Sequence, residues 1–316
     1  MTVVGRLAPS PTGRLHIGHA RSFLLAWWSA RSQSGRIVLR IEDLDTQRIR
    51  PELIDDCVRD LEWLGLDWDV GPRLQSSGLE AILAAAEKLN REGLAYPCVC
   101  SRADVKSSAN APQEGVEEWR YSGTCRGLYR NRADAIARSG KLSALRFTVE
   151  PGLVAVLDSF AGVHSFDVCK EVGDFPILRR DESPAYQLAV VVDDARDGVT
   201  EVLRGDDLLS SAARQQLLYR ALDLNVPRWI HVPLVANAEG RRLAKRADDV
   251  SLNELRQRGV DPRALVAWVA GSIGCNFGRF VTVAEVVKEF HLEGISKARI
   301  SVTPETLVPG NSSLDH

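Results

Sequence analysis

The chain has 316 residues, and its 45% hydrophobic and 26% charged residues match the average of soluble globular proteins, which excludes a disordered or fibrous chain. This length allows one large α/β core with a smaller attachment. Forty Lys and Arg against 42 Asp and Glu give a net charge of −2, which excludes a globally basic nucleic-acid clamp. Apolar runs are too short for a membrane span, and Arg6 interrupts any signal-peptide core, so we expect a cytoplasmic protein without membrane association.

Strands and helices alternate from the N-terminus. Residues 3–8 form a predicted strand, a loop of Pro, Ser, Pro, Thr and Gly follows, and residues 17–31 form a predicted helix. A second strand is predicted over residues 36–41 and a second helix over residues 51–64. This βαβα order predicts an α/β fold with a parallel sheet and helices on its faces.

The alternation is interrupted between residues 97 and 173, where we expect an insertion with its own small fold and short strands near residues 145–149 and 153–157. It resumes with a helix, a strand, a helix and a strand over residues 186–194, 199–203, 206–222 and 230–235. Residues 1–96 and 174–240 would then form one Rossmann-like domain that is split in sequence. Residues 241–316 would form a charged loop and a small helical part, with helices near residues 252–258, 262–273 and 283–290.

Six cysteines are too few for a disulfide scaffold, and in a reducing compartment clustered thiols favour a metal site. Cys98 and Cys100 are followed by Tyr121 and Cys125, and three thiols with a fourth donor fit a closed tetrahedral Zn²⁺ site. The spacing is equally compatible with cysteines that pack on the two faces of a strand. The separate cysteines are expected to fill the core: Cys57, Cys169 and Cys275.

Two histidines stand where the first strand leads into the first helix. Pro9, Ser10, Pro11, Thr12 and Gly13 are followed by His16, Ile17, Gly18 and His19. In a parallel sheet this position faces the ligand crevice, and a helix start offers unpaired N–H groups to a phosphate. A lone histidine here would be read as a cap or a surface residue, but two that flank Ile-Gly favour a nucleotide site.

These residues resemble the signature of class I aminoacyl-tRNA synthetases, and residues 6–13 look like the opening of the glutamate-specific branch. Leu243, Ala244, Lys245 and Arg246 resemble the second family signature, although the family normally has Ser where Ala244 stands. The resemblance implies that ATP, with Mg²⁺, reacts with an amino acid carboxylate to give an aminoacyl-adenylate. By the same resemblance His16, His19 and Lys245 would be catalytic, and these three with Gly18 would bind ATP.

Glutamate carries two carboxylates and one ammonium, so its pocket needs positive groups and one negative group. The resemblance to glutamyl-tRNA synthetases implies a set drawn from three strand ends and one helix: Arg6, Leu7, Ala8, Pro9, Ser10, Glu42, Tyr186 and Arg204. Glu42 would hold the ammonium, and Arg204 argues for glutamate over glutamine because a second guanidinium gains nothing from a neutral amide. Taken singly, such residues at strand ends are usually solvated. Asp193 and Asp194 are expected to be structural.

Few residues follow Lys245, so we expect no anticodon-binding domain. The resemblance therefore narrows to a stand-alone subgroup of the glutamate family, which activates glutamate without tRNA and transfers it to queuosine in the anticodon loop of tRNA(Asp). In that subgroup Cys98, Cys100, Tyr121 and Cys125 would hold one structural zinc, and the protein would be a monomer. Three alternatives stay open: a truncated synthetase that charges a tRNA 3′ end, a related nucleotidyltransferase, and a non-enzymatic paralogue that binds glutamate or RNA.

Overall fold

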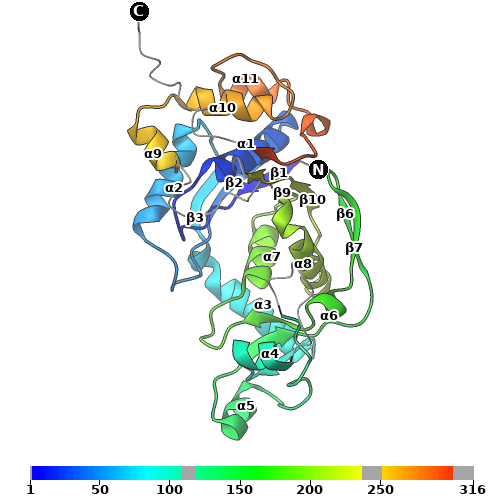
Figure 1. Cartoon of the computed structure of the whole chain (residues 1–316). Helices are drawn as coiled ribbons and strands as arrows, with labels where there is room; N and C mark the ends of the chain where they lie inside the picture. The colour runs from blue at the N-terminus through cyan, green and yellow to red at the C-terminus, as the bar shows by residue number, and fades with distance from the viewer. Residues whose placement is uncertain (1, 109–118, 237–250, 302–316) are drawn as a thin grey trace, which may run out of the picture.

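Parallel strands lie at the centre of the computed structural model, which describes residues 2–108, 119–236 and 251–301 (Figure 1). One sheet has the order β1 (Val4–Leu7), β2 (Arg36–Ile41) and β3 (Val70–Leu74), and β9 (Glu201–Gly205) pairs in parallel with β10 (Arg228–Val232) in another. The two sheets adjoin at β1 and β9, because the Thr200 N–H donates to the Val4 carbonyl over 2.9 Å. The predicted parallel α/β arrangement is therefore confirmed.

Helices cover both faces of these strands. One face packs against α1 (Ile17–Ser32) and α2 (Glu52–Trp63), and the other against α3 (Leu79–Arg91), α7 (Tyr186–Arg196) and α8 (Leu209–Ala221). Short 3₁₀ turns, η1 (Gln75–Gly78) and η2 (Asp206–Leu208), precede α3 and α8. Side chains alternate along β9, so that Leu203 faces the core beside α1 and Val202 faces the core beside α7 and α8.

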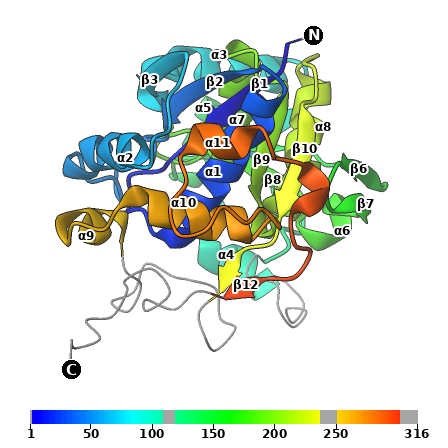
Figure 2. The ribbon, with the colours of Figure 1, turned by 90° about the horizontal axis from the view of Figure 1, so that it is seen from above.

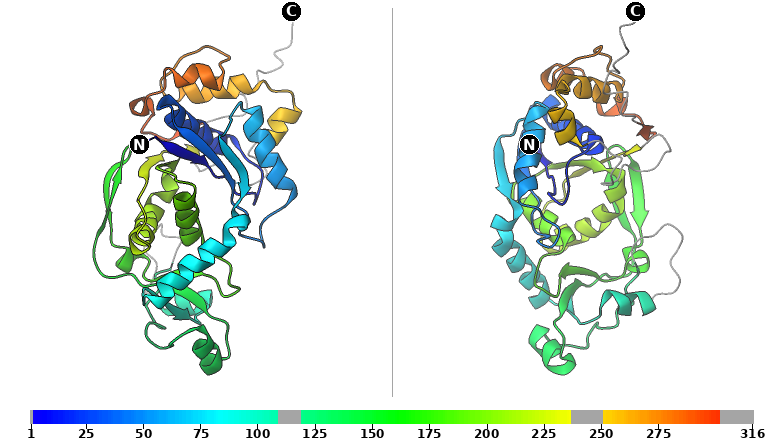
Figure 3. Two further views of the ribbon diagram at one scale, coloured as in Figure 1. Left: turned by 180° about the vertical axis from the view of Figure 1, so that it is seen from behind. Right: turned by 60° about the vertical axis from the view of Figure 1, so that its left-hand side comes forward.

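The middle of the chain adds an antiparallel sheet in the order β4 (Ala95–Cys98), β5 (Ala144–Phe147), β8 (Phe175–Leu178). Three short helices surround it: α4 (Arg102–Ser108), α5 (Arg132–Ser139) and α6 (Val168–Glu171). The hairpin of β6 (Val154–Asp158) and β7 (Gly162–Phe166) runs from this end of the molecule to the central strands (Figures 1 and 3). There Asp158 of β6 is paired in register with Trp229 of β10, which brings residue 158 to the central sheet.

The C-terminal helices α9 (Leu252–Gln257), α10 (Pro262–Gly271) and α11 (Val283–Val287) pack against α1 and α2. Figure 2 shows α10 and α11 lying over α1. The Trp28 indole of α1 donates to the Val283 carbonyl over 3.0 Å, and one hydrophobic cluster contains residues of α1, β1, α2 and all three C-terminal helices. After the turn η3 (Leu292–Gly294), β12 (Ile300–Ser301) pairs with β11 (Val235–Ala236).

The predicted elements are observed with ends shifted by a few residues, and two differ more. The helix expected over residues 206–222 begins as the turn η2, and the last helix ends at Val287. Cys57 is buried as expected, whereas Cys169 and Cys275 are only partly buried. No helix within the described residues is long and apolar enough to cross a bilayer.

Candidate active site

His16 and His19 cap the start of α1 together. The His16 Nδ1 accepts the Gly18 N–H over 3.1 Å, and the His19 Nδ1 accepts the His16 N–H over 3.2 Å, which forms a reciprocal capping box. The ring centroids are 3.8 Å apart. Because both Nδ1 atoms act as acceptors, the proton of each neutral ring lies on Nε2, where it can be donated to a phosphate oxygen.

The chain that follows the second signature returns to this helix start. The Leu252 N–H donates to the Leu15 carbonyl over 2.8 Å, and Ser251 forms an isolated β-bridge with His16. Ala244 and Lys245 themselves lie outside the described residues. The described residues thus place the end of that segment, but not its lysine, beside the two histidines.

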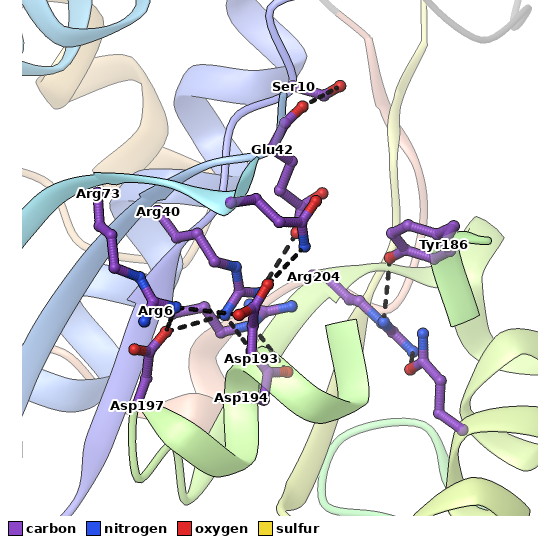
Figure 4. Close-up of polar contacts among 12 residues, drawn as sticks. Arg6, Ser10, Arg40, Glu42, Arg73, Tyr186, Asp193, Asp194, Asp197 and Arg204 are labelled. Atoms are coloured by element: carbon purple, nitrogen blue, oxygen red, sulfur yellow. Dashed lines mark hydrogen bonds and ion pairs between the residues drawn. The ribbon is translucent and has the colours of Figure 1, made fainter. Parts of the chain in front are cut away.

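The residues of the predicted glutamate pocket lie toward the carboxyl ends of β1, β2 and β9 and at the start of α7 (Figure 4). Arg6, on β1, is 7% exposed, donates to the Leu203 carbonyl over 3.2 Å and lies 3.7 Å from Asp194. Ser10 donates to the Glu42 carbonyl over 3.3 Å, and the Glu42 N–H donates to the Pro9 carbonyl over 2.9 Å. The Leu7 side chain is wholly in the core, so only its backbone can face a ligand.

Arg204 and Tyr186 come together on the other side of the pocket. The Arg204 Nη1 donates to the Tyr186 hydroxyl over 3.5 Å, and Nη2 donates to Gln215 Oε1 over 2.9 Å. The guanidinium is 6% exposed, whereas Tyr186 at the start of α7 is 36% exposed. A buried guanidinium beside a phenol hydroxyl is an arrangement that can bind a carboxylate.

Buried ion pairs lie beneath these residues. Two of the arginines that form them, Arg40 and Arg73, were not predicted from the sequence. Arg40 is fully buried and contacts Asp194 at 2.8 Å, Asp197 at 3.2 Å and Glu42 at 3.3 Å. Arg73 joins it through Asp193 and Asp197. Asp193 and Asp194 are therefore structural, as expected.

Glu42 is the most exposed of the four acidic side chains in these ion pairs, at 14%, whereas Asp193, Asp194 and Asp197 are at most 5% exposed. Burial raises its pKa, and the charges of Arg40 and Arg6 act against that shift. A carboxylate in this position gains from a bound ammonium, because a positive ligand supplies the charge partner that water no longer provides.

Three thiols and one phenol converge at the edge of the antiparallel sheet. The sulfur atoms of Cys98, Cys100 and Cys125 lie within 4.8 Å of one another, and the Tyr121 hydroxyl is 3.3 Å from Cys98 and 3.8 Å from Cys100. Tetrahedral zinc with bonds near 2.3 Å needs sulfur atoms about 3.8 Å apart, so the group fits this metal. All three cysteines are free, and burial raises the pKa of the Cys100 thiol to about 12.

Arg146 of β5 adds a positive charge to this cluster. Its Nε donates to the Cys98 sulfur over 3.3 Å, and its guanidinium lies 3.9 Å from the centroid of the Tyr121 ring. A site with three thiolates carries excess negative charge over one Zn²⁺, and the guanidinium opposes that excess. No sequence signal pointed to this residue, since β5 reaches the cysteines only through sheet pairing with β4.

Several known proteins are similar to this chain over most of its length. Residues 2–308 match the family model of class I tRNA synthetases for glutamate and glutamine, catalytic domain. A glutamyl-Q tRNA(Asp) synthetase of Symbiobacterium thermophilum is 44% identical, with 96% of this chain and 97% of the relative covered, and one of Rhodopirellula baltica is 43% identical, with 86% and 85% covered. The crystal structure of glutamate-tRNA synthetase from Elizabethkingia anophelis superposes with a TM-score of 0.82 at 26% identity, covering 97% of this chain and 69% of that one.

Proposed function

Because the chain belongs to the class I tRNA synthetase family for glutamate and glutamine, we propose that it activates L-glutamate with ATP and transfers it to the queuosine base of tRNA(Asp). Activation proceeds without tRNA and yields glutamyl-adenylate and pyrophosphate. The observation that carries the proposal is the charge pattern of the pocket. Arg6 and Arg204 converge on it from β1 and β9, and Glu42 faces it after β2.

This pattern complements free glutamate. Glu42 binds the α-ammonium, Arg6 and Ser10 hold the α-carboxylate toward the α-phosphate, and Arg204 with Tyr186 binds the side-chain carboxylate. A glutamine amide would bring its own N–H groups against the Arg204 guanidinium, which can only donate. The pocket residues thereby place one carboxylate oxygen for in-line attack and select the substrate.

The start of α1 receives the ATP phosphates. His16 and His19 donate from Nε2, and Gly18 between them has no side chain to obstruct the nucleotide. Lys245 stands six residues before Ser251, a reach of at most about 20 Å, and Ser251 bridges to His16. We therefore assign Lys245 to the same phosphates, and Mg²⁺ bound with ATP would neutralise part of their charge.

The acceptor assignment rests on the relatives. Chains named glutamyl-Q tRNA(Asp) synthetase align over nearly the same length as this one, whereas the glutamate-tRNA synthetase structure extends further. The near-neutral net charge agrees with a protein that contacts only a small part of its tRNA, such as the anticodon loop. We propose that the protein acts as a monomer.

We assign one structural zinc to Cys98, Cys100, Cys125 and Tyr121. The metal would crosslink β4 to the segment around residue 121, where the local apolar cluster is small. Arg146 would balance the thiolate charge. All four donors are protein groups, which leaves no open position and favours structure over catalysis.

Two assays test the function. Pyrophosphate exchange into ATP that requires glutamate and proceeds without tRNA is expected, and exchange that is independent of glutamate would favour a nucleotidyltransferase. Radiolabelled glutamate is then expected to become attached only to tRNA(Asp) that contains queuosine. If tRNA that lacks queuosine were labelled equally, and if the label were lost when the 3′ end is removed, the protein would be a synthetase that charges the 3′ end.

A further inference from the structure

Arg204 makes several contacts besides those with Tyr186 and Gln215. Its Nη2 donates to the Leu208 carbonyl over 3.3 Å, and its Nε donates to His231 Nε2 over 2.9 Å. The guanidinium also lies 5.1 Å from the centroid of the Trp229 ring. These contacts fix Nε and Nη2, so that Nη1, which meets the Tyr186 hydroxyl over 3.5 Å, is the nitrogen left for a substrate.

His231 is 1% exposed, and its protonation is dictated by its two neighbours. A guanidinium N–H can only donate, so the His231 Nε2 must present a lone pair to Arg204. The ring proton then lies on Nδ1, which donates to Asp158 Oδ2 over 2.6 Å. Burial, reinforced by the charge of Arg204, lowers the pKa of His231, in agreement with a neutral ring.

Asp158 arrives from a part of the chain that supplies no other residue of the pocket. It ends β6 and is 6% exposed. Its Oδ1 accepts the N–H groups of Phe160 and Ala161 over 2.9 and 2.7 Å. The backbone N–H of His231 donates to Oδ1 over 3.2 Å and to Oδ2 over 3.1 Å, and the His231 ring meets Oδ2. The turn of the β6–β7 hairpin thus orients the carboxylate, and the carboxylate orients the imidazole.

We propose that Asp158 and His231 are positioning residues that set the specificity for the side-chain carboxylate of glutamate by fixing the orientation of Arg204. Asp158 selects the Nδ1–H tautomer of His231, and that tautomer offers the Nε2 lone pair that accepts the Arg204 Nε–H. In the other tautomer an Nε2–H of His231 would face the Nε–H of Arg204. Two donors cannot bond to each other, so the guanidinium would move. This inference rests on the proposed function, because it names what keeps Arg204 in place for that substrate.

Asp158→Asn is the sharpest test because it keeps the volume of the side chain. The amide oxygen is expected to stay with Phe160 and Ala161, so the amide NH₂ faces Nδ1 and reverses the tautomer. We expect the KM for glutamate to rise about tenfold or more, with the KM for ATP unchanged and weaker discrimination against glutamine. His231→Phe should act alike, and His231→Gln, which restores an acceptor, should recover most of the affinity. His291→Phe, at an exposed histidine whose side chain makes no cap hydrogen bond before η3, is the matched control.

A double-mutant cycle separates positioning from general support of the fold. Once His231 is Phe, Asp158→Asn is expected to add little to the KM for glutamate, whereas additive effects would overturn the proposal. An unchanged KM for glutamate in Asp158→Asn would overturn it as well.

A second readout needs no enzymatic activity. Imidazole ¹⁵N NMR should show His231 protonated at Nδ1 in the wild type and at Nε2 in Asp158→Asn, and a wild-type signal from the other tautomer would overturn the proposal. A wild type with the expected tautomer but no glutamate-dependent exchange would instead refute the proposed function and remove the substrate on which this inference depends.

Discussion

Arg204 is the residue on which the choice of substrate depends most directly. It is buried, and its hydrogen bonds leave the Nη1 edge beside Tyr186 for a ligand. In Arg204→Gln the side-chain carboxylate of glutamate would lose its charged partner, which costs about 2–4 kcal/mol of binding free energy. We expect the kcat/KM for glutamate in pyrophosphate exchange to fall about 30-fold or more, and the ratio of glutamate to glutamine activation to fall with it.

Arg59→Gln is the matched control for this prediction. Arg59 is an exposed guanidinium on α2 that pairs with Asp56 over 2.7 Å. The same chemical change at residue 59 should leave the kcat/KM for glutamate and the ratio of glutamate to glutamine activation unaltered, since exposed ion pairs contribute little. If Arg204→Gln behaved like Arg59→Gln, Arg204 would not bind the side chain of the substrate.

At the scale of elements, one close approach shapes the cysteine cluster. The Tyr121 N–H donates to the Val172 carbonyl over 2.8 Å, and Gly173 has a φ of +72°. A Cβ at Gly173 would lie 2.1 Å from the Tyr121 carbonyl oxygen, which is too close for any side chain. Gly173→Ala must therefore move the strand segment that carries Tyr121. We expect lower zinc content by atomic absorption and a lower melting temperature.

Gly127→Ala separates this steric effect from backbone strain. Gly127 has a similar φ of +74°, but nothing lies within 4 Å of its Cβ position. Left-handed strain costs about 1–2 kcal/mol in either variant, so both should melt earlier. Only Gly173→Ala should lose zinc, and equal metal content in the two variants would mean that the approach of Tyr121 does not define the site.

The contact between α2 and α9 is expected to depend on pH. Asp60 is 1% exposed, and burial, with repulsion from Asp56, raises its pKa to about 6 despite the Arg256 guanidinium 3.4 Å away. The folded pKa lies above the value of about 3.9 in an unfolded chain, so the contribution of Asp60 to stability is complete below pH 4 and is lost as the pH rises through 6. Asp60→Asn should therefore gain stability relative to the wild type as the pH rises from 4 to 7 in urea denaturation. Parallel pH profiles would contradict this.

Local patterns predicted β1, α1 and β2 well because each is defined by its own periodicity and caps. They did not predict that β6 would pair with β10, and so Asp158, 73 residues from His231, was not recognised. Arg40 and Arg73 were missed for a similar reason: their partners on α7 are brought to them only by the sheet. His16 and His19 were predicted from one compact motif, whereas Glu42, Tyr186 and Arg204 were predicted only from the resemblance to a family.

At the scale of the whole molecule, the C-terminal helices complete the hydrophobic core on the α1 side of the central sheet. Leu265, Val269 and Val286 are fully buried in the cluster that contains Leu24 and Leu25 of α1. Arg21 of α1 donates to the Ser272 hydroxyl directly after α10, so a polar contact also joins α1 to the C-terminal part. The same side chain donates to the Pro233 carbonyl after β10. The helix that carries His16 and His19 therefore depends on residues 252–301 for its packing.

A chain that ends at Ala236 tests this dependence. Without α9, α10 and α11 the apolar face of α1 would be exposed to water, and each buried Leu or Val side chain contributes about 1.5–3 kcal/mol when it is removed from water. We expect the shortened chain to lack a cooperative thermal transition by circular dichroism and to aggregate on size-exclusion chromatography. A chain that ends at Ser301 keeps every contact described for the C-terminal helices, so it should melt like the full chain. If the chain ending at Ala236 folded cooperatively and bound ATP, α1 would be stable on the sheet alone, and the C-terminal helices would serve another purpose.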